Sequence, residues 1–361
     1  MNLDILTRNI QKKNLKSRIL LLTVSLALSV IYTKSTILKL ILCSLSVVPL
    51  AVITGGLISE ISNFIGPKKG GLLTATIGNI PELFMGLWAI RYGMTNLVKA
   101  SLIGAIVSNM LLVLGISVFI GGVKYKEQRF SKIAARLNFN QLVLALSAMV
   151  VLATLNRYAV ITEHNMLKIS LLISIVLILV YLLGLIFSLY THYNLFVISE
   201  GCDEYSKFNK NGTVYLILEI IFITLVLYFI SQRLIASVYS FVNEYNFKEE
   251  YMGIVLIPIL GNIGENLSSI IAACKNKINL SIEVAIGSSL QMTLFVTPLL
   301  IIYSYFSGGS LNFLFPNFHI ILSGLSVIMS FLVFQDGKTY WMEGAILISI
   351  YMMMVIALYY I

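Results

Sequence analysis

The sequence predicts an all-α integral membrane protein built around two inverted halves, and three observations lead there. Hydrophobic residues make up 58% of the 361 residues and charged residues only 11%, whereas soluble domains carry about 25% charged residues. Long apolar runs alternate with short polar loops. One segment, Gly-Asn-Ile-Pro-Glu at 78–82, returns as Gly-Asn-Ile-Gly-Glu at 261–265.

A helix needs about 20 apolar residues to cross the hydrocarbon core, and this length divides the chain into eleven expected spans, of which the first is short. The segment before it, 1–17, is too polar for the apolar core of a signal peptide, and we expect a basic, solvated tail. The expected spans lie at 18–33, 36–60, 70–92, 95–121, 138–156, 166–190, 213–240, 251–274, 279–306, 317–334 and 340–360.

The basic residues of the loops predict the orientation. With the N-terminus in the cytoplasm, 17 Lys and Arg residues fall in inner segments and 7 in outer segments, and Arg233 lies inside a span. Cytoplasmic loops are enriched in Lys and Arg, so this split predicts a cytoplasmic N-terminus. An odd number of spans then places the C-terminus outside. The net charge of +9 therefore indicates membrane topology, and we expect no nucleic-acid partner.

The two copies of the short segment lie in the third and eighth spans, which cross the membrane in opposite directions. This predicts an inverted repeat of five plus five helices, an architecture of many secondary transporters, with a site near the midplane. We expect a tail and extra helix at 1–35, a first repeat at 36–190, a cytoplasmic linker at 191–212 and a second repeat at 213–361. An alternative for the acidic residues of the linker is a calcium-sensing role.

The repeated segment carries one carboxylate in each copy. Glu82 and Glu265 are 183 residues apart, and so are Gly104 and Gly287 in the spans that follow. An acid inside a membrane span is costly, so it indicates a functional site. Further oxygen-bearing side chains surround the two acids in the sequence: Asn79 and Asn262, three residues before each acid, and Ser108, Asn109, Ser288, Ser289 and Gln291 in the following spans.

These residue types favour a hard cation such as Ca²⁺, which takes six to eight oxygen ligands. The cysteines Cys43, Cys202 and Cys274 are scattered, and the three histidines lie at span ends. This arrangement argues against a disulfide framework and against zinc or copper. Because metal ligands must be deprotonated, a metal ion and protons compete for them. Exchange results if the site changes the side of the membrane to which it opens only when Ca²⁺ or two protons neutralise both acids.

Each feature also has a structural interpretation. Glu82 and Glu265 could form ion pairs with buried basic residues. Asn79 and Asn262 could cap a broken helix or hold two helices together, and the small residues near Gly104 and Gly287 could serve close helix packing. Glu60 and Glu244, near span ends, could be solvated anchors or take part in gating.

The paired Gly-Asn-x-x-Glu segments, each followed by a Gly-rich polar helix, resemble the α repeats of the cation/proton exchangers in the calcium/cation antiporter superfamily. The resemblance begins near residue 40 and is strongest at 66–122 and 250–300, where Gly-Ser-Ser-Leu-Gln at 287–291 is especially similar. It implies eleven spans, H⁺-driven Ca²⁺ export, Glu82 and Glu265 as central acids, and a moving gate formed by the second and seventh spans. It also implies that the Asn, Ser and Gln residues named above are ligands or proton carriers.

The sequence departs from that family at two positions. Asn266 stands directly after the second acid, where many members have His, and Pro81 replaces a small or hydroxylated residue. Because Asn does not titrate, a proton relay through position 266 is absent.

The sequence therefore predicts a Ca²⁺/H⁺ antiporter of the cell membrane, with Ca²⁺ and H⁺ as substrates, the bilayer as its environment and no cofactor. A homo-oligomer is compatible with this prediction. Alternatives are the same fold carrying Na⁺ or Mn²⁺, and a passive cation channel. An intramembrane metalloenzyme would need a His-Glu-x-x-His pair or an equivalent nucleophile, so we expect no enzyme.

Overall fold

The computed structural model describes residues 3–31, 33–65, 77–158, 162–192 and 210–360, and these residues are almost entirely helical. Within the described ranges the helices are α1 (Leu3–Val30), α2 (Thr36–Ile65), α4 (Ile80–Arg91), α5 (Thr95–Val107), α6 (Leu114–Tyr125), α7 (Lys132–Tyr158), α8 (Glu163–Ile186), α10 (Lys210–Tyr245), α11 (Glu249–Tyr251), α12 (Ile257–Gly261), α13 (Ile263–Cys274), α14 (Ile278–Gln291), α15 (Thr297–Phe306), α16 (Asn317–Val333) and α17 (Trp341–Tyr360).

Several of these helices are long enough to cross a membrane. In the described part of the chain, seven continuous helical stretches have the length and apolarity of a span, and a bent pair, Glu249–Gly261 with Ile263–Cys274, makes an eighth. Ser17–Val30 and Asn317–Val333 are shorter apolar helices. The prediction of an all-α, multi-pass membrane protein is therefore confirmed, whereas the count of eleven spans and the division into repeats stay predictions.

The N-terminal segment is helical, and its placement as a solvated tail stays a prediction. Helix α1 begins at Leu3, so most of the segment 1–17 continues the first apolar helix without a break. The predicted linker falls largely in 193–209 and the start of the third predicted span in 66–76, and both of these segments lie outside the described residues.

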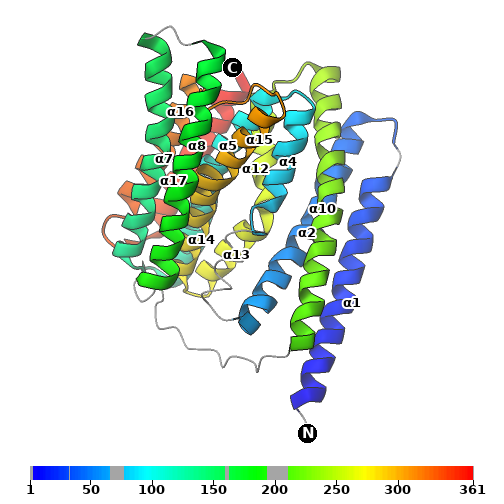
Figure 1. Ribbon diagram of the computed structural model, residues 1–361. Coiled ribbons are helices and arrows are strands. Elements are labelled where there is room, and N and C mark those ends of the chain that lie inside the picture. Colours follow the sequence, from blue (N-terminus) through cyan, green and yellow to red (C-terminus); the bar gives the residue numbers. More distant parts are fainter. Residues whose placement is uncertain (1–2, 32, 66–76, 159–161, 193–209, 361) are drawn as a thin grey trace.

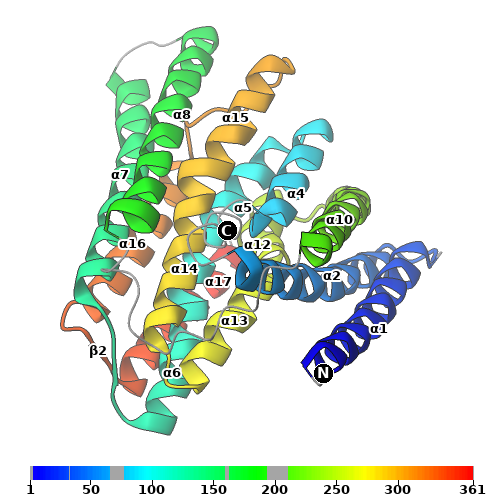
Figure 2. The same ribbon diagram turned by 60° about the horizontal axis from the view of Figure 1, so that its bottom comes forward.

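Three helices stand together on one side of the molecule. Helices α1, α2 and α10 lie beside one another in both views, and the remaining helices form a larger bundle (Figures 1 and 2). Arg18 on α1 links the three helices, because its guanidinium pairs with Glu60 on α2 and, at 3.1 Å, with Glu219 on α10. The predicted gate helices, α2 and α10, are thus one packed unit with α1.

The larger bundle is fastened at one end by a short antiparallel ribbon that the sequence did not predict. Strand β1 (Gln128–Arg129) pairs with β2 (Lys338–Thr339), with Gln128 opposite Thr339. The buried Gln128 side chain donates to the carbonyl of Ala273 at 3.1 Å, which fastens the ribbon to α13. A strand of two residues is too short to give a recognisable pattern in the sequence. The ribbon forms only because the two loops lie next to each other in the fold.

The ribbon also carries a charged cluster. Glu127 accepts hydrogen bonds from Arg129 at 2.8 Å, from Lys338 at 3.3 Å and from the Tyr340 hydroxyl at 3.1 Å. The bond from Arg129, followed by the one from Lys338, lowers the pKa of Glu127. The same carboxylate raises the pKa of Tyr340, because it accepts the phenolic proton in a hydrogen bond.

Candidate functional site

The second copy of the repeated segment lies where a membrane helix is broken, and the first copy lies at the start of a helix. Asn262 separates α12 from α13, which bend by 64° between them, and Asn79 is in a turn directly before α4. The backbone angles of the two asparagines are nearly the same, with φ −98° and ψ 19° at Asn79 and φ −93° and ψ 13° at Asn262. Neither side chain caps the helix that follows. The capping interpretation is therefore wrong, and both amides are available for other contacts.

The two acids take equivalent places after these asparagines. Glu82 is the third residue of α4 and Glu265 is the third residue of α13. The first turn of a helix carries a partial positive charge, which favours a carboxylate there. In each copy the asparagine side chain is free for other contacts, and the helix that begins after it favours an acid in its first turn.

Neither acid has an ion-pair partner in the described part of the chain, so the ion-pair interpretation is not supported. Glu82 is only 5% exposed, and both of its oxygens lack a hydrogen bond. Oε2 of Glu265 is also buried without a partner. Buried polar atoms are nearly always hydrogen-bonded in native proteins, so an unpartnered carboxyl needs a specific explanation. A bound cation or proton supplies one.

The first acid reaches across to the second copy of the segment. A Cβ atom placed on Gly261 would be 2.7 Å from Oε1 of Glu82 and 2.8 Å from its Cγ. The two carboxyls are near enough to interact electrostatically. Glycine at 261 therefore provides the space into which Glu82 fits, and the acids of the two halves form one site.

The amides and one hydroxyl connect the same site. The Asn79 side-chain amide donates to Oε1 of Gln291 on α14. The Ser288 hydroxyl, one turn earlier on α14, is 3.1 Å from Oδ1 of Asn262 and 3.5 Å from Oδ1 of Asn79. The four side chains form a cluster that contains residues from both halves of the chain, beside the two acids.

Three other predicted site residues are buried but are not joined to this cluster by a hydrogen bond. The Ser289 hydroxyl donates to the carbonyl of Ala285 in its own helix at 3.2 Å. The Ser108 hydroxyl and the Asn109 amide nitrogen are buried without a partner. Ser289 is therefore turned toward its own backbone, whereas Ser108 and Asn109 keep unused hydrogen-bonding capacity.

The spans that follow the acids each contain a π-helical segment, which the sequence did not predict. These are η1 (Ser108–Val113) and η4 (Met292–Val296). The repeat offset of 183 residues places η4 inside the counterpart of η1. Single π turns within α-helices are often found at functional sites, because they redirect side chains at a small cost in hydrogen bonding.

Close helix packing requires glycine at position 104 but not at position 287, its counterpart in the second half. A Cβ atom on Gly104 would be 2.6 Å from Cα of Ile254 and 2.7 Å from the Pro258 ring, so α5 approaches the broken helix there. A Cβ atom on Gly287 would meet no described atom within 4 Å. The packing interpretation is supported at Gly104 only.

Further acids lie within the expected spans and were not predicted as site residues, among them Glu283 and Glu219. Glu283 lies on α14, with Oε1 accepting from the Asn279 amide at 3.0 Å, and Glu219 pairs with Arg18. Their position inside apolar runs was the signal that could have found them. The described residues contain no group of three His, Cys, Asp or Glu side chains that could hold a metal ion. A cation at the paired acids would therefore rely on amide, hydroxyl or carbonyl oxygens for its other ligands.

Comparison with known proteins agrees with this arrangement. The Ca²⁺/H⁺ antiporter ChaA of Bacillus subtilis (strain 168) is 33% identical over 333 residues, which are 92% of this chain and 94% of that protein. The Ca²⁺/H⁺ antiporter of Aphanothece halophytica is 33% identical over 330 residues, 88% of each chain.

Solved structures and a family pattern extend the likeness. The structure of native YfkE has a TM-score of 0.79 and 30% identity and covers 96% of this chain and 100% of that one. The H⁺/Ca²⁺ exchanger CAX, at 15% identity, shares the fold with a TM-score of 0.68 over 95% of this chain and 88% of that one. The sequence pattern of the sodium/calcium exchanger protein family matches residues 35–190 and 215–360. The chain therefore belongs to the sodium/calcium exchanger protein family.

Proposed function

We propose that this protein is an antiporter that exchanges Ca²⁺ for H⁺ by alternating access and exports Ca²⁺ from the cytosol. The observation that carries the proposal is the pair of buried acids, Glu82 and Glu265, with unpartnered carboxyl oxygens in the first turns of α4 and α13. The relatives named as Ca²⁺/H⁺ antiporters support the same pair of substrates.

In this mechanism the two carboxylates, the amide oxygens of Asn79 and Asn262 and the neighbouring polar side chains of α14 bind Ca²⁺. Ser108 and Asn109 are further candidate ligands or proton carriers. Because ligands must be deprotonated, two protons displace the metal ion, and the metal ion displaces the protons.

The coupling follows from the energy of the empty, ionised site. On insertion scales a carboxylate at the membrane centre costs about 3 kcal/mol, so two of them cost about 6 kcal/mol. That cost corresponds to a roughly 10⁴-fold lower population of the form in which both acids are ionised while the site switches between its inward-open and outward-open states. Binding of Ca²⁺ or of two protons removes the net charge of the pair. Only the protein with a bound Ca²⁺ or two protons therefore switches between the inward-open and outward-open states at an appreciable rate.

The packing of α1, α2 and α10 supports a rigid unit that moves against the larger bundle as the gate. The distribution of loop charges supports a cytoplasmic N-terminus and an external C-terminus. The Ile-, Lys- and Asn-rich composition supports a bacterial cell membrane as the location.

The test uses the full chain in proteoliposomes with a proton gradient, acidic inside, and measures accumulation of Ca²⁺ against its own gradient. We expect uphill uptake that stops when the proton gradient is collapsed. Glu82→Gln and Glu265→Gln should each lower uptake at least tenfold, whereas Glu163→Gln, at the exposed start of α8, should not. Full uptake by both site variants would refute the proposal. Downhill flux alone would indicate a channel, and uptake of Na⁺ or Mn²⁺ with no competition by Ca²⁺ would indicate another substrate.

A further inference from the structure

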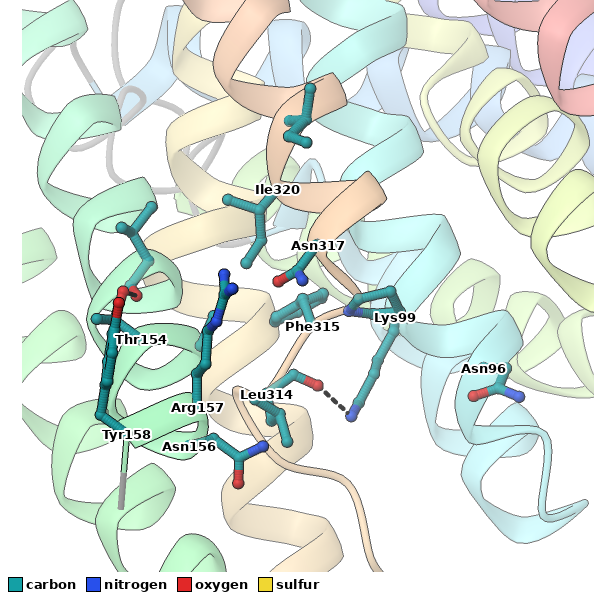
Figure 3. Close-up of a pocket in the computed structure, with 14 residues that line it drawn as sticks. Asn96, Lys99, Thr154, Asn156, Arg157, Tyr158, Leu314, Phe315, Asn317 and Ile320 are labelled. Atoms are coloured by element: carbon teal, nitrogen blue, oxygen red, sulfur yellow. Dashed lines mark hydrogen bonds between the residues drawn. The ribbon is translucent and has the colours of Figure 1, made fainter. Parts of the chain in front are cut away.

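A second cavity lies away from the paired acids, at the end of the bundle where α7 ends and α5 and α16 begin. It has a volume of about 1010 Å³ and is lined by residues of these three helices and of the segment before α16 (Figure 3). None of the residues of the paired-acid site lines it. The cavity is therefore separate from the paired-acid site.

One side of the cavity holds a cation without a counter-ion. The Lys99 ammonium donates to Oδ1 of Asn312 at 2.9 Å. It also donates to the carbonyl of Leu314 at 2.7 Å (Figure 3). Both acceptors are neutral, and Lys99 forms no ion pair with any described residue. An ammonium has three donors, so one remains for a further partner. The half-buried Lys99 is held in place at the cavity while its charge stays uncompensated.

The other side contributes a second cation and neutral donors. Figure 3 shows Arg157 rising from α7 and Lys99 from α5, with residues 314–317 between them. The described lining also includes the amides of Asn96, Asn156 and Asn317, and it contains no acidic residue. Guanidinium and ammonium groups together are the common means of binding a phosphate group. The charge of this cavity thus fits an anion.

The start of α16 adds to this preference. Asn317 is the first residue of the 17-residue helix, and Pro316, which precedes it, provides no side-chain cap. The first backbone N–H groups of a helix have no partner inside the helix, and the helix dipole favours negative charge there. Together with the two cations, this helix start makes the polar half of the cavity suitable for a phosphate.

The remaining lining is apolar and continues onto the outer surface of the bundle. Val150 on α7 and Ile321 on α16 line the cavity and are 47% and 64% exposed. Val143 on α7 and Ile328 on α16 lie seven residues away on the same helix faces and are 55% and 57% exposed. Two apolar stripes therefore extend from the cavity along the membrane-facing surface, where acyl chains lie.

We propose that this cavity, with Lys99 and Arg157 on either side, binds the headgroup of an anionic phospholipid whose acyl chains lie along α7 and α16. A free phosphate ion would use the cations alone. A lipid uses the cations and the apolar stripes together, and for this reason we favour the lipid. Under the orientation proposed above, the lipid belongs to the outer leaflet.

The test is photocrosslinking of the purified full chain with phosphatidylglycerol that carries a diazirine next to its glycerol backbone, followed by peptide mapping. We expect crosslinks in the peptides that contain residues 150–158 and 314–321. Unlabelled phosphatidylglycerol should compete, whereas phosphatidylcholine, which has no net charge, and millimolar inorganic phosphate should not.

Variants place the interaction in this cavity. One basic residue near a membrane surface contributes about 1 kcal/mol to anionic lipid binding, which is about fivefold in affinity. Arg157→Gln, at an exposed position, should therefore raise about fivefold the concentration of unlabelled phosphatidylglycerol that halves the crosslinking. The double variant, Lys99→Gln with Arg157→Gln, should raise this concentration further. Lys168→Gln, an exposed cation on α8 outside the cavity, should leave it unchanged.

Four results would overturn the proposal. Equal competition by phosphatidylcholine would show that charge is not recognised, and competition by inorganic phosphate would show a site for small anions. Crosslinks that map elsewhere, or that Arg157→Gln leaves unchanged, would show that the cavity does not bind the lipid. Calcium transport need not be measured, so the outcome does not depend on the proposed exchange.

Discussion

The side-chain amide of Asn79, in the turn before α4, donates a hydrogen bond to Oε1 of Gln291 on α14. These residues are 212 positions apart and belong to opposite halves of the chain. The bond therefore fixes the start of α4 against the polar helix α14 of the second half. It also orients Oδ1 of Asn79 toward the Ser288 hydroxyl, in the same cluster as Oδ1 of Asn262.

Replacing Gln291 should weaken Ca²⁺ binding while leaving the fold intact. In Gln291→Ala the buried Asn79 amide loses its acceptor, and leaving such a group unsatisfied costs about 1–3 kcal/mol. We expect the Ca²⁺ concentration for half-maximal transport to rise about 10-fold. The control is Ser289→Ala, because that hydroxyl is bonded to its own helix at Ala285. Equal effects of the two substitutions would show that the Asn79–Gln291 bond has no special part in binding.

Adding one methyl group at Gly261 should displace Glu82. The new Cβ would be 2.7–2.8 Å from three atoms of that side chain, so the carboxyl must move away from the second half. We expect Gly261→Ala to lower Ca²⁺ transport at least tenfold in the proteoliposome assay. Gly324→Ala on α16 is the matched control, since a Cβ there meets no described atom within 4 Å. Normal transport by Gly261→Ala would mean that the position of Glu82 is not critical.

Removing the guanidinium that links α1, α2 and α10 should loosen that unit. The side chains of Arg18, Glu60 and Glu219 are 14%, 20% and 23% exposed, so Arg18→Gln leaves two partly buried acids without a counter-ion. Because removing one partner of a fully buried pair costs about 3–5 kcal/mol, we expect a loss of about 1–2 kcal/mol at this partial exposure. The apparent melting temperature of the purified protein should fall by several degrees.

The control for that experiment is Arg129→Gln, whose side chain is 75% exposed and pairs with Glu127 at the surface. Exposed ion pairs contribute about 0–1 kcal/mol, so its melting temperature should stay close to that of the wild type. If Arg129→Gln and Arg18→Gln lower it equally, the Arg18 pairs do not join the three helices.

The ribbon between β1 and β2 should weaken in acid. Hydrogen bonds from Arg129 and Lys338 lower the pKa of Glu127 in the folded protein. A lowered folded-state pKa means that this carboxylate contributes stability above its unfolded-state pKa and loses it as the pH falls through the folded-state value. The loss should therefore occur below the ordinary glutamate pKa of about 4.3.

Hydrogen exchange at the amide of Phe130, which donates to the carbonyl of Gly337 at 3.1 Å, reports on the ribbon. After correction for the intrinsic exchange rate, protection should decrease below that pH in the wild type. Glu127→Gln should show weaker protection that does not change with pH in this range. An equal pH dependence in the variant would assign the effect to another group.

Much of the fold and the central pair of acids could be predicted from the sequence, because both depend on composition and spacing. Membrane spans are long and apolar, so their positions were close to the observed helices from α2 to α17. The costly placement of Glu82 and Glu265 in apolar runs, at one repeat offset, identified them without any contact information. The helical conformation of 3–17 was not predicted, because a polar sequence can extend a helix without entering the apolar core.

The side-chain contacts at the site could not be predicted in the same way. Ser288 and Ser289 are adjacent and chemically identical, yet one hydroxyl contacts Asn262 and the other the carbonyl of Ala285. Successive residues on a helix point about 100° apart, so only the packing of α14 against the starts of α4 and α13 decides which of them faces the site. The lipid cavity depends likewise on three helix ends that are distant in sequence.

The sequence by itself determined that the chain crosses the membrane repeatedly and carries two equivalent acids inside apolar segments, since the bilayer imposes span length and penalises charge. The tertiary structure alone decided that Glu82 fits against Gly261, that Asn79 bonds Gln291 and that Arg18 joins three helices. These are contacts between residues up to 212 positions apart. Their geometry follows from how the helices pack together, which no local pattern of residues specifies.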